Sequence, residues 1–64
     1  MKEYNVYFQI ADEMHCETYR NMNNAIAAYN EKIGHCEKVE LCEYLPDGET
    51  DWSGEENVID VWEA

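Results

Sequence analysis

Three cysteines and two histidines are the side chains that could hold a metal ion or carry nucleophilic chemistry. They are Cys16, Cys36, Cys42, His15 and His35. Zinc sites usually have paired ligands a few residues apart, as in Cys-x-x-Cys, and no such spacing is present. His15 and Cys16 are neighbours in a predicted strand, so their side chains should point to opposite faces. Small apolar cysteines and surface histidines are therefore the favoured interpretation, and no metal site is predicted.

Asp47, Glu49 and Asp51 stand at alternate positions, as do the first oxygen ligands of a calcium-binding loop. The EF-hand pattern also requires Gly at position 6 and Glu at position 12 of the loop. This chain has Trp52 and Val58 at those positions. A specific calcium site is therefore not expected, and no cofactor of any kind is predicted.

Cysteine, histidine and an acid could form a nucleophilic triad, but such residues are common and only geometry defines one. No sequence typical of a nucleophile family occurs, and no pair of catalytic carboxylates stands out among the fifteen acidic residues. A chain of 64 residues also leaves little room for both a core and a deep substrate cavity. The chain is therefore predicted not to be an enzyme.

The acidic residues are concentrated in the second half of the chain. Residues 37–64 hold ten of the fifteen acidic side chains and one of the four basic ones, within a net charge of −11. A dense negative surface repels nucleic acid and anionic membranes and attracts basic proteins. Direct nucleic-acid binding also needs a basic groove for the phosphates, which Lys38 alone cannot supply. The expected partner is therefore a basic protein, and neither nucleic acid nor a membrane.

Length and composition indicate one small acidic domain spanning residues 1–64. Apolar residues make up 45% of the chain and eight aromatic residues are spread along it, which a disordered acidic tail would lack. The cysteine count is odd, no secretory leader is visible, and the longest apolar run, 25–29, is far too short for a membrane span. A cytoplasmic protein with reduced thiols is therefore expected.

Alternating apolar residues predict two strands in the first twenty residues. The period of two runs over residues 4–10, breaks at 11–13 and resumes over 14–19. We expect the two segments to form a hairpin around a turn at 11–13.

Residues 21–34 have the period of an amphipathic helix. Asn21 is a favourable N-cap, because its side chain can accept hydrogen bonds from free N–H groups of the first turn. Gly34 can adopt the left-handed conformation that ends many helices. The apolar stripe of this helix consists of Met22, Ile26, Tyr29 and Ile33.

The period of two returns at residues 39–41 and 59–61, on either side of a long connection over 45–57 that is rich in turn-forming and acidic residues. The order ββαββ predicts an α+β fold in which one helix packs on one face of a four-stranded antiparallel sheet. The strand order cannot be read from the sequence.

One helix should cover one face of the sheet and leave the other face open to solvent. Strand alternation assigns to the covered face Val6, Phe8, Ile10, Met14, Cys16, Val39, Leu41, Ile59 and Val61. It assigns to the open face Tyr7, Tyr19, Tyr44 and Trp62, with Gln9, His15, Glu17, Lys38, Glu40, Cys42, Val58 and Asp60. Aromatic residues are enriched at protein interfaces, although cross-strand packing or a face simply exposed to water would leave the same pattern.

These observations favour a non-catalytic protein that binds a basic protein surface, such as the nucleic-acid cleft of another protein. Carboxylates would steer association and aromatic side chains would supply buried contact. In charge and architecture the chain is similar in type to the small inhibitors that phages and mobile elements direct against host nucleases. The predicted partner-binding residues are Glu40, Glu43, Asp47, Glu49, Asp51, Glu55, Glu56, Asp60, Tyr7, Tyr19, Tyr44, Trp52 and Trp62.

Two other functions remain open. The chain could be a homodimerising accessory domain, because burying the open face across a two-fold axis would add core to a short chain. It could also bind a non-basic partner through Trp52 and the connection at 46–57, in which case binding would depend little on salt. The residues expected in a dimer interface are Tyr7, Tyr19, Tyr44, Val58 and Trp62.

Overall fold

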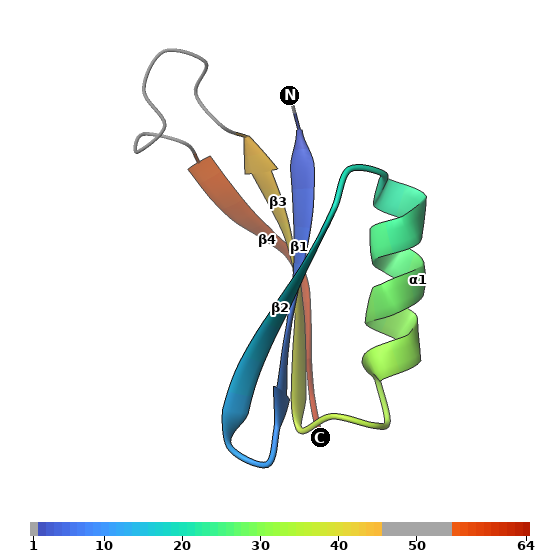
Figure 1. Ribbon diagram of the computed structural model, residues 1–64, viewed down its shortest axis with the longest axis vertical. Coiled ribbons are helices and arrows are strands. Elements are labelled where there is room, and N and C mark those ends of the chain that lie inside the picture. The colour runs from blue at the N-terminus through green and yellow to red at the C-terminus, as the bar shows by residue number, and fades with distance from the viewer. Residues whose placement is uncertain (1, 46–54) are drawn as a thin grey trace.

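The computed structural model of the chain describes residues 2–45 and 55–64. The strands form one antiparallel sheet in the order β2-β1-β3-β4, and the helix lies on one face of it (Figure 1). The predicted ββαββ arrangement of an α+β fold is confirmed. The strand order, which the sequence did not reveal, places β1 and β3 at the centre. The elements are β1 (Glu3–Ile10), β2 (Glu13–Tyr19), α1 (Met22–Lys32), β3 (Lys38–Leu45) and β4 (Glu55–Glu63).

Helix α1 begins and ends close to the predicted positions because both ends are capped by the predicted residues. The Oδ1 atom of Asn21 accepts hydrogen bonds from the backbone N–H groups of Asn23 at 2.7 Å and Asn24 at 3.3 Å. Gly34 has a φ of 94°, and the backbone N–H groups of the next two residues both donate to the carbonyl of Lys32 at 3.1 Å. Two N–H groups of the first turn and the carbonyl of Lys32 therefore have partners within the chain.

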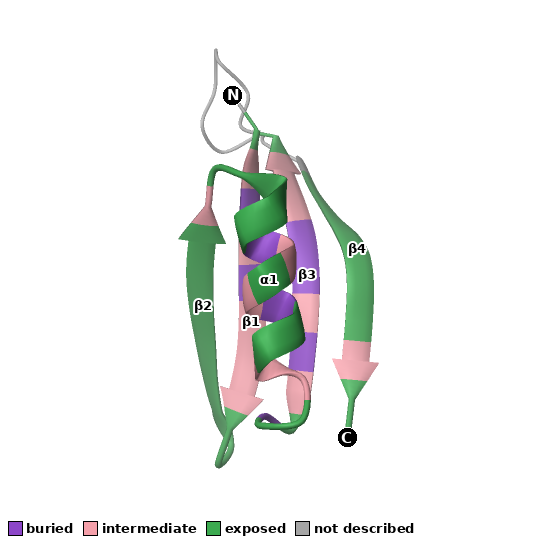
Figure 2. Ribbon diagram, turned by 90° about the vertical axis from the view of Figure 1, so that its right-hand side faces the viewer, coloured by how far each residue is buried: buried purple, intermediate pink, exposed green. Residues whose placement is uncertain are grey.

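The hydrophobic core lies between α1 and the two central strands. Val6 and Val39 are completely buried, and Ala25, also completely buried, lets the helix approach the sheet closely. Figure 2 shows buried segments of β1 and β3 behind α1, while β2 and β4 flank the helix on either side and are mostly exposed. The buried residues of this core are Tyr4, Val6, Ala25, Tyr29, Cys36, Val39 and Leu41.

Two residues predicted for the covered side lie at the ends of elements and are exposed instead. Ile10, the last residue of β1, is 44% exposed, and Met22, in the first turn of α1, is 39% exposed. The buried surface of the helix comes from Ala25 and Tyr29, with Ile26 partly buried beside them.

The turn between β1 and β2 is one residue shorter than predicted. Ile10 pairs with Glu13, so Ala11 and Asp12 alone form the turn, with φ values of 51° and 67°. Two successive positive φ values define the type I′ turn, whose twist matches that of a β-hairpin. Because strand residues alternate between faces, a shift of one residue exchanges the two sides of a strand.

The predicted faces of β2 are therefore wrong. Met14 and Cys16 lie opposite Gln9 and Tyr7, on the side of the sheet away from α1. The residues of β2 on the helix side are instead Glu13, His15, Glu17 and Tyr19.

Strand β4 contains a bulge that changes its alternation. Leu41 of β3 pairs with Asp60 and the next residue, Cys42, pairs with Val58, so Ile59 is an extra residue between them. No residue type indicates this bulge, because Val58 and Ile59 are both suitable strand residues.

As a result, the predicted faces of the last part of β4 are also wrong. Trp62 pairs with the buried Val39 and packs against the core on the helix side, which is also the side of Asp60. Val61 pairs with Glu40 on the opposite side and is 42% exposed. Alternation within β4 was predicted with the wrong phase, because that phase depends on pairing with β3.

Candidate protein-interaction face

The side of the sheet away from α1 is not covered by any described element (Figure 1). We call this side the open face. The pairing of the strands places on it Glu3, Asn5, Tyr7, Gln9, Met14, Cys16, Thr18, Lys38, Glu40, Cys42, Tyr44, Glu56, Val58, Val61 and Glu63.

A chain of hydrogen bonds crosses the open face from β4 to β2. The Oε2 atom of Glu56 accepts hydrogen bonds from the Asn5 amide at 2.8 Å and from the Tyr7 hydroxyl at 2.7 Å. The Thr18 hydroxyl donates to Oδ1 of Asn5 at 2.7 Å. These side chains therefore hold one another in place on an otherwise uncovered surface.

Because β3 lies between β4 and β1, the Glu56 side chain must pass over β3 to reach Tyr7. Cys42 of β3, which pairs with Asn5 on the same face, is only 1% exposed. Its Sγ atom lies 3.4 Å from Oε1 of Glu40.

Burial raises the pKa of the Cys42 thiol to about 12, and the hydrogen bond to Glu40 and the nearby negative charges act in the same direction. The thiol is therefore protonated at physiological pH. A catalytic cysteine needs the opposite environment, one that favours the thiolate.

The Glu56 carboxylate keeps the Tyr7 hydroxyl protonated. Its hydrogen bond to Glu56 raises the pKa of Tyr7 well above the ordinary value, and burial and the negative charge of Glu56 add to this effect. The hydroxyl therefore stays a hydrogen-bond donor, and one oxygen of Glu56 is held by two neutral donors.

The open face contains a shallow hollow of about 210 Å³. All four strands contribute to it. The ring of Tyr7 and the side chain of Met14, which is 59% exposed, provide apolar walls. Two carboxylates and one ammonium group provide the polar part. The lining residues are Tyr7, Met14, Lys38, Glu40 and Glu56.

The predicted partner-binding residues fall into three groups. The open face brings together Tyr7, Glu40, Tyr44 and Glu56. The helix side of the sheet carries Tyr19, Glu43, Asp60 and Trp62. Outside the described residues lie Asp47, Glu49, Asp51 and Trp52, while Glu55 is the first residue of β4 and pairs with Leu45.

The residues on the helix side have structural partners there. The Tyr19 hydroxyl donates to Oε1 of Glu17 at 2.6 Å, and Lys2 lies 3.5 Å from Glu43. Burial raises the pKa of Tyr29, with a further contribution from the nearby carboxylate of Asp60. The prediction that Tyr19 and Trp62 lie on the open face is therefore wrong, and neither can contribute to a partner surface on that side.

Lys32 joins α1 to β2 on the helix side. Its Nζ atom lies 3.3 Å from Oε1 of Glu17 and 4.2 Å from the centre of the Phe8 ring. The His15 ring stacks on Phe8 with 5.3 Å between ring centres. A cation and two rings thus fill the space that the predicted apolar face of β2 would have occupied.

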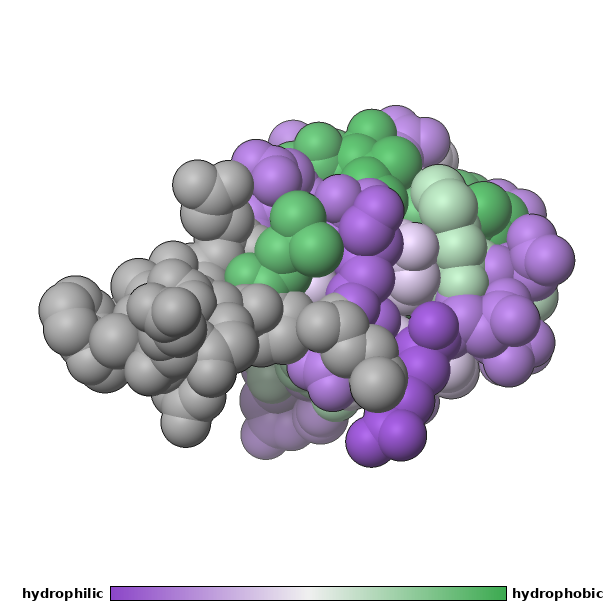
Figure 3. All heavy atoms as spheres, turned by 90° about the horizontal axis from the view of Figure 1, so that it is seen from above, coloured by the Kyte–Doolittle hydropathy of each residue, from purple (hydrophilic) through white to green (hydrophobic). Residues whose placement is uncertain are grey.

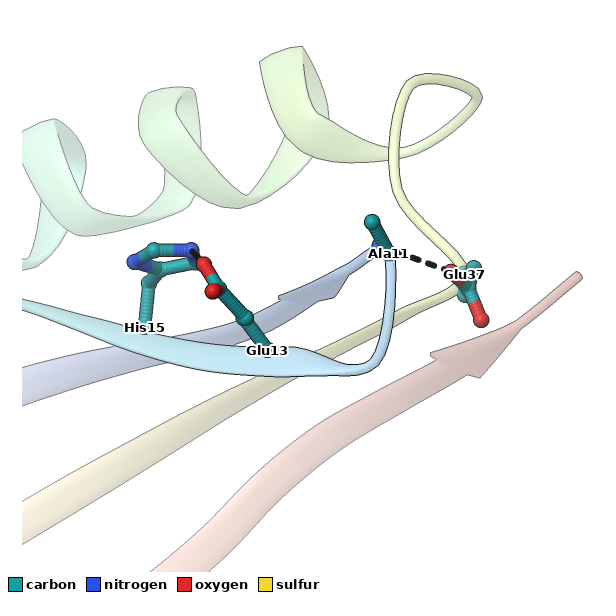
Figure 4. A network of polar contacts seen from close by, with 4 residues as sticks. All are labelled: Ala11, Glu13, His15 and Glu37. Atoms are coloured by element: carbon teal, nitrogen blue, oxygen red, sulfur yellow. Dashed lines mark hydrogen bonds and ion pairs between the residues drawn. The ribbon is translucent and has the colours of Figure 1, made fainter.

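Figure 4 shows His15 on the side of β2 that faces α1, with the carboxylate of Glu13 3.7 Å from its Nε2 atom. The same view shows the backbone N–H of Ala11 donating to Oε1 of Glu37 at 2.9 Å. Glu37 therefore supports the β1–β2 turn and does not belong to the open face.

Several residues of the open face were not predicted from the sequence. Asn5 shares its alternation with Tyr7, which was a usable signal. Met14 and Thr18 could be placed only with the correct two-residue turn. Lys38 was assigned to the correct face, but its position beside two carboxylates depends on the strand order.

Within residues 2–45 and 55–64, no group of three or more His, Cys, Asp or Glu side chains is arranged to hold a metal ion. The candidate calcium ligands Asp47, Glu49 and Asp51 lie outside that part of the chain. The described part of the chain also has no helix with the length and apolar character needed to cross a membrane.

No family model, no curated protein and no solved structure matches this chain. The residues of the open face and the net charge of the chain therefore carry the functional inference.

Proposed function

We propose that this protein is a non-catalytic interaction protein whose open face binds a basic surface of another protein. The observation that carries the proposal is the position of Glu40 and Glu56 beside Tyr7, on a sheet face that no described element covers. Aromatic rings next to carboxylates combine buried contact with charge complementarity.

Two further features support this assignment. The net charge of −11 would attract a basic partner over a long range, so association should be fast at low salt and slower at high salt. The carboxylate of Glu56 is already fixed by Asn5 and Tyr7, which reduces the entropy lost when a partner binds it.

The partner class that fits best is a nucleic-acid-binding protein, because such proteins carry basic clefts. Occupying a cleft of this kind would make the chain an inhibitor that mimics nucleic-acid charge. Duplex DNA should then compete with the chain for the partner. If DNA does not compete, the partner can still be a basic protein, but the chain does not act by mimicking nucleic-acid charge.

The test uses two variants with the same net charge. One carries Glu40→Gln and Glu63→Gln on the open face, and the other carries Glu13→Gln and Glu31→Gln on the helix side. Partners captured by the wild-type chain at low salt are identified and purified, and their affinities for all three proteins are measured by calorimetry at two salt concentrations.

We expect the open-face variant to bind a basic partner about tenfold more weakly, from the loss of two interfacial charges, and the helix-side variant to lose about twofold or less. Added salt should weaken wild-type binding. Recovery of neutral or acidic proteins only, or equal losses in the two variants, would contradict the proposal.

A second candidate function, homodimerisation through the same face, is favoured by its exposed apolar residues. Met14, Val58 and Val61 are 59%, 56% and 42% exposed. Figure 3, which looks down the long axis from above, shows apolar side chains beside hydrophilic ones at that end of the molecule. Tyr19 and Trp62 are not part of this dimer interface, because they lie on the helix side of the sheet. Sedimentation should show a concentration-dependent dimer, and a monomer at the highest soluble concentration would exclude it.

We also propose that the protein works in a reducing, cytoplasmic environment. All three cysteines are free, with Cys16 exposed and Cys36 and Cys42 buried. A chain in an oxidising compartment would be exposed to intermolecular pairing through Cys16. Mass spectrometry of the protein isolated from its cells should find all three thiols reduced.

A further inference from the structure

We infer that the hollow on the open face receives an arginine side chain of the basic partner. The inference rests on the proposed function and names the group that the same face recognises. Three features support it: the shape of the hollow, its charges and the way one of its carboxylates is held.

The walls of the hollow suit the apolar and planar parts of an arginine. A hollow of about 210 Å³ has room for one long side chain but not for a folded segment. Tyr7 offers a ring on which a guanidinium can stack, and Met14 offers a flexible apolar contact for its methylene groups.

The acceptors of the hollow suit the guanidinium donors. Glu56 uses Oε2 to accept from Asn5 and Tyr7, and no hydrogen bond of its Oε1 atom is seen among the described residues. Among the described residues, Glu40 accepts one weak contact, at 3.4 Å from the Cys42 thiol. Two carboxylates with this much unused acceptor capacity can take a planar, multidentate donor.

Of the described residues that line the hollow, Lys38 alone is a cation, and it partly offsets the two carboxylates. The hollow still carries two carboxylates against one ammonium group, so it disfavours phosphate or carboxylate ligands. A lysine could enter the hollow, but it lacks the planar fork and the stacking surface, so arginine should bind more tightly. Removing the charge of Lys38 should therefore increase the affinity for a cation.

The probe is N-acetyl-arginine methylamide, with the lysine analogue and the neutral citrulline analogue as matched ligands. Binding is followed by NMR through the Met14 methyl resonance, assigned with Met14→Leu, and through the backbone amides. We expect saturable shifts near Met14 and Tyr7 with a Kd on the order of 10 mM, in the weak range of a single side chain. The shifts should be smaller with lysine and absent with citrulline.

Three variants, each with one charge removed, should have three different effects on arginine binding. Glu40→Gln should weaken arginine binding about fivefold, Lys38→Gln should strengthen it about twofold or more, and Glu31→Gln on the exposed side of α1 should leave it unchanged. Circular dichroism checks that each variant keeps the fold. Equal effects of Glu40→Gln and Glu31→Gln, or shifts centred away from Met14, would overturn the inference.

Different experimental results would contradict the inference and the proposed function. If a purified basic partner still responds to Glu40→Gln with Glu63→Gln but is indifferent to Lys38→Gln and Met14→Ala, the face is correct and the arginine site is wrong. If no basic partner binds, the proposed function fails whatever the probe does. A dimer that Arg20→Gln dissociates would show that the occupant is a second copy of the chain, which would also overturn the inference.

Discussion

The Tyr7 hydroxyl on β1 donates a 2.7 Å hydrogen bond to Glu56 on β4, although β3 separates the two strands. This contact ties an edge strand directly to a central strand. Because the bond crosses the strand that carries Cys42, which is only 1% exposed, we expect it to restrict access to the thiol.

Replacing Tyr7 by Phe should therefore have two effects. We expect a loss of about 1 kcal/mol in the free energy of unfolding, because a hydrogen bond to a charged acceptor is removed from a half-exposed site. We also expect faster reaction of Cys42 with a thiol reagent. Urea denaturation and reagent kinetics, both in a Cys16→Ala background, measure the two effects.

A double-mutant cycle with Glu56→Gln controls this experiment. The two single losses should sum to more than the loss in the double variant, because both remove the same contact. Additive losses and an unchanged Cys42 rate would show that the contact does not operate in solution.

Stability should fall as the pH rises above 9. The pKa of Cys42 is raised from the ordinary thiol value of 9.0 to about 12 in the folded protein, so the folded state holds its proton longer than the unfolded state. The corresponding stability is complete below pH 9 and is lost progressively between pH 9 and 12. Tyr7, Tyr19 and Tyr29, whose pKa values are also raised, act in the same direction.

Urea denaturation at neutral pH and at several values between 9 and 12 tests this dependence. The Cys42→Ala variant should lose stability less steeply with pH over this range, even if it starts from a lower value. A wild-type stability that stays constant through the range would contradict the expectation.

Two substitutions in the β1–β2 turn should increase the stability of the protein. Ala11 and Asp12 both have positive φ, which costs an ordinary residue about 1–2 kcal/mol relative to its preferred conformations. Replacing Ala11 by Asn and Asp12 by Gly supplies the residues that type I′ turns prefer and should stabilise the protein by about 1 kcal/mol. The backbone N–H of residue 11 still donates to Glu37.

Thermal denaturation measures this gain. The single change Asp12→Asn is the control, because it removes the same charge without supplying a glycine. An equal rise in Tm in the control would attribute the effect to charge alone.

Lys32 should contribute more to stability than an exposed lysine does. Its side chain is 15% exposed, and it contacts both the Phe8 ring and the Glu17 carboxylate. Lys32→Met keeps most of the apolar stem and should cost about 1 kcal/mol through the lost cation. Lys2→Met, which breaks the exposed pair with Glu43, makes the same change in net charge and should cost about 0.5 kcal/mol or less.

Both lysine variants are compared by urea denaturation at low and high salt. Salt should reduce the difference between them only partly, because the Lys32 ammonium group is largely shielded from solvent. Equal losses would mean that Lys32 acts only as a surface charge.

The sequence was sufficient to predict elements whose signals are local. The cap at Asn21 and the left-handed Gly34 define α1 through contacts within a few residues, and both were recognised. The order ββαββ followed from changes of period along the chain. None of these predictions depended on distant parts of the chain.

The predictions that were wrong concern the phase of two edge strands. In β2 the phase depends on whether the turn has two or three residues, and Ala11-Asp12 lacks the Asn-Gly sequence that would have identified a type I′ turn. In β4 it depends on the extra residue Ile59 and on pairing with β3. The composition of the open face was therefore only partly predictable, and the bond between Tyr7 and Glu56 required the strand order.

Glu37 connects three segments that are far apart in the sequence. Its backbone N–H donates to the carbonyl of Gln9, its side chain accepts from the N–H of Ala11, and its carbonyl accepts from the N–H of Ala64. The first hairpin, the exit from α1 and the end of β4 thus meet at a single residue. Fraying of β4 at this end must break a bond to the segment that supports the hairpin turn, so local opening here should be coupled across the molecule and not confined to one strand.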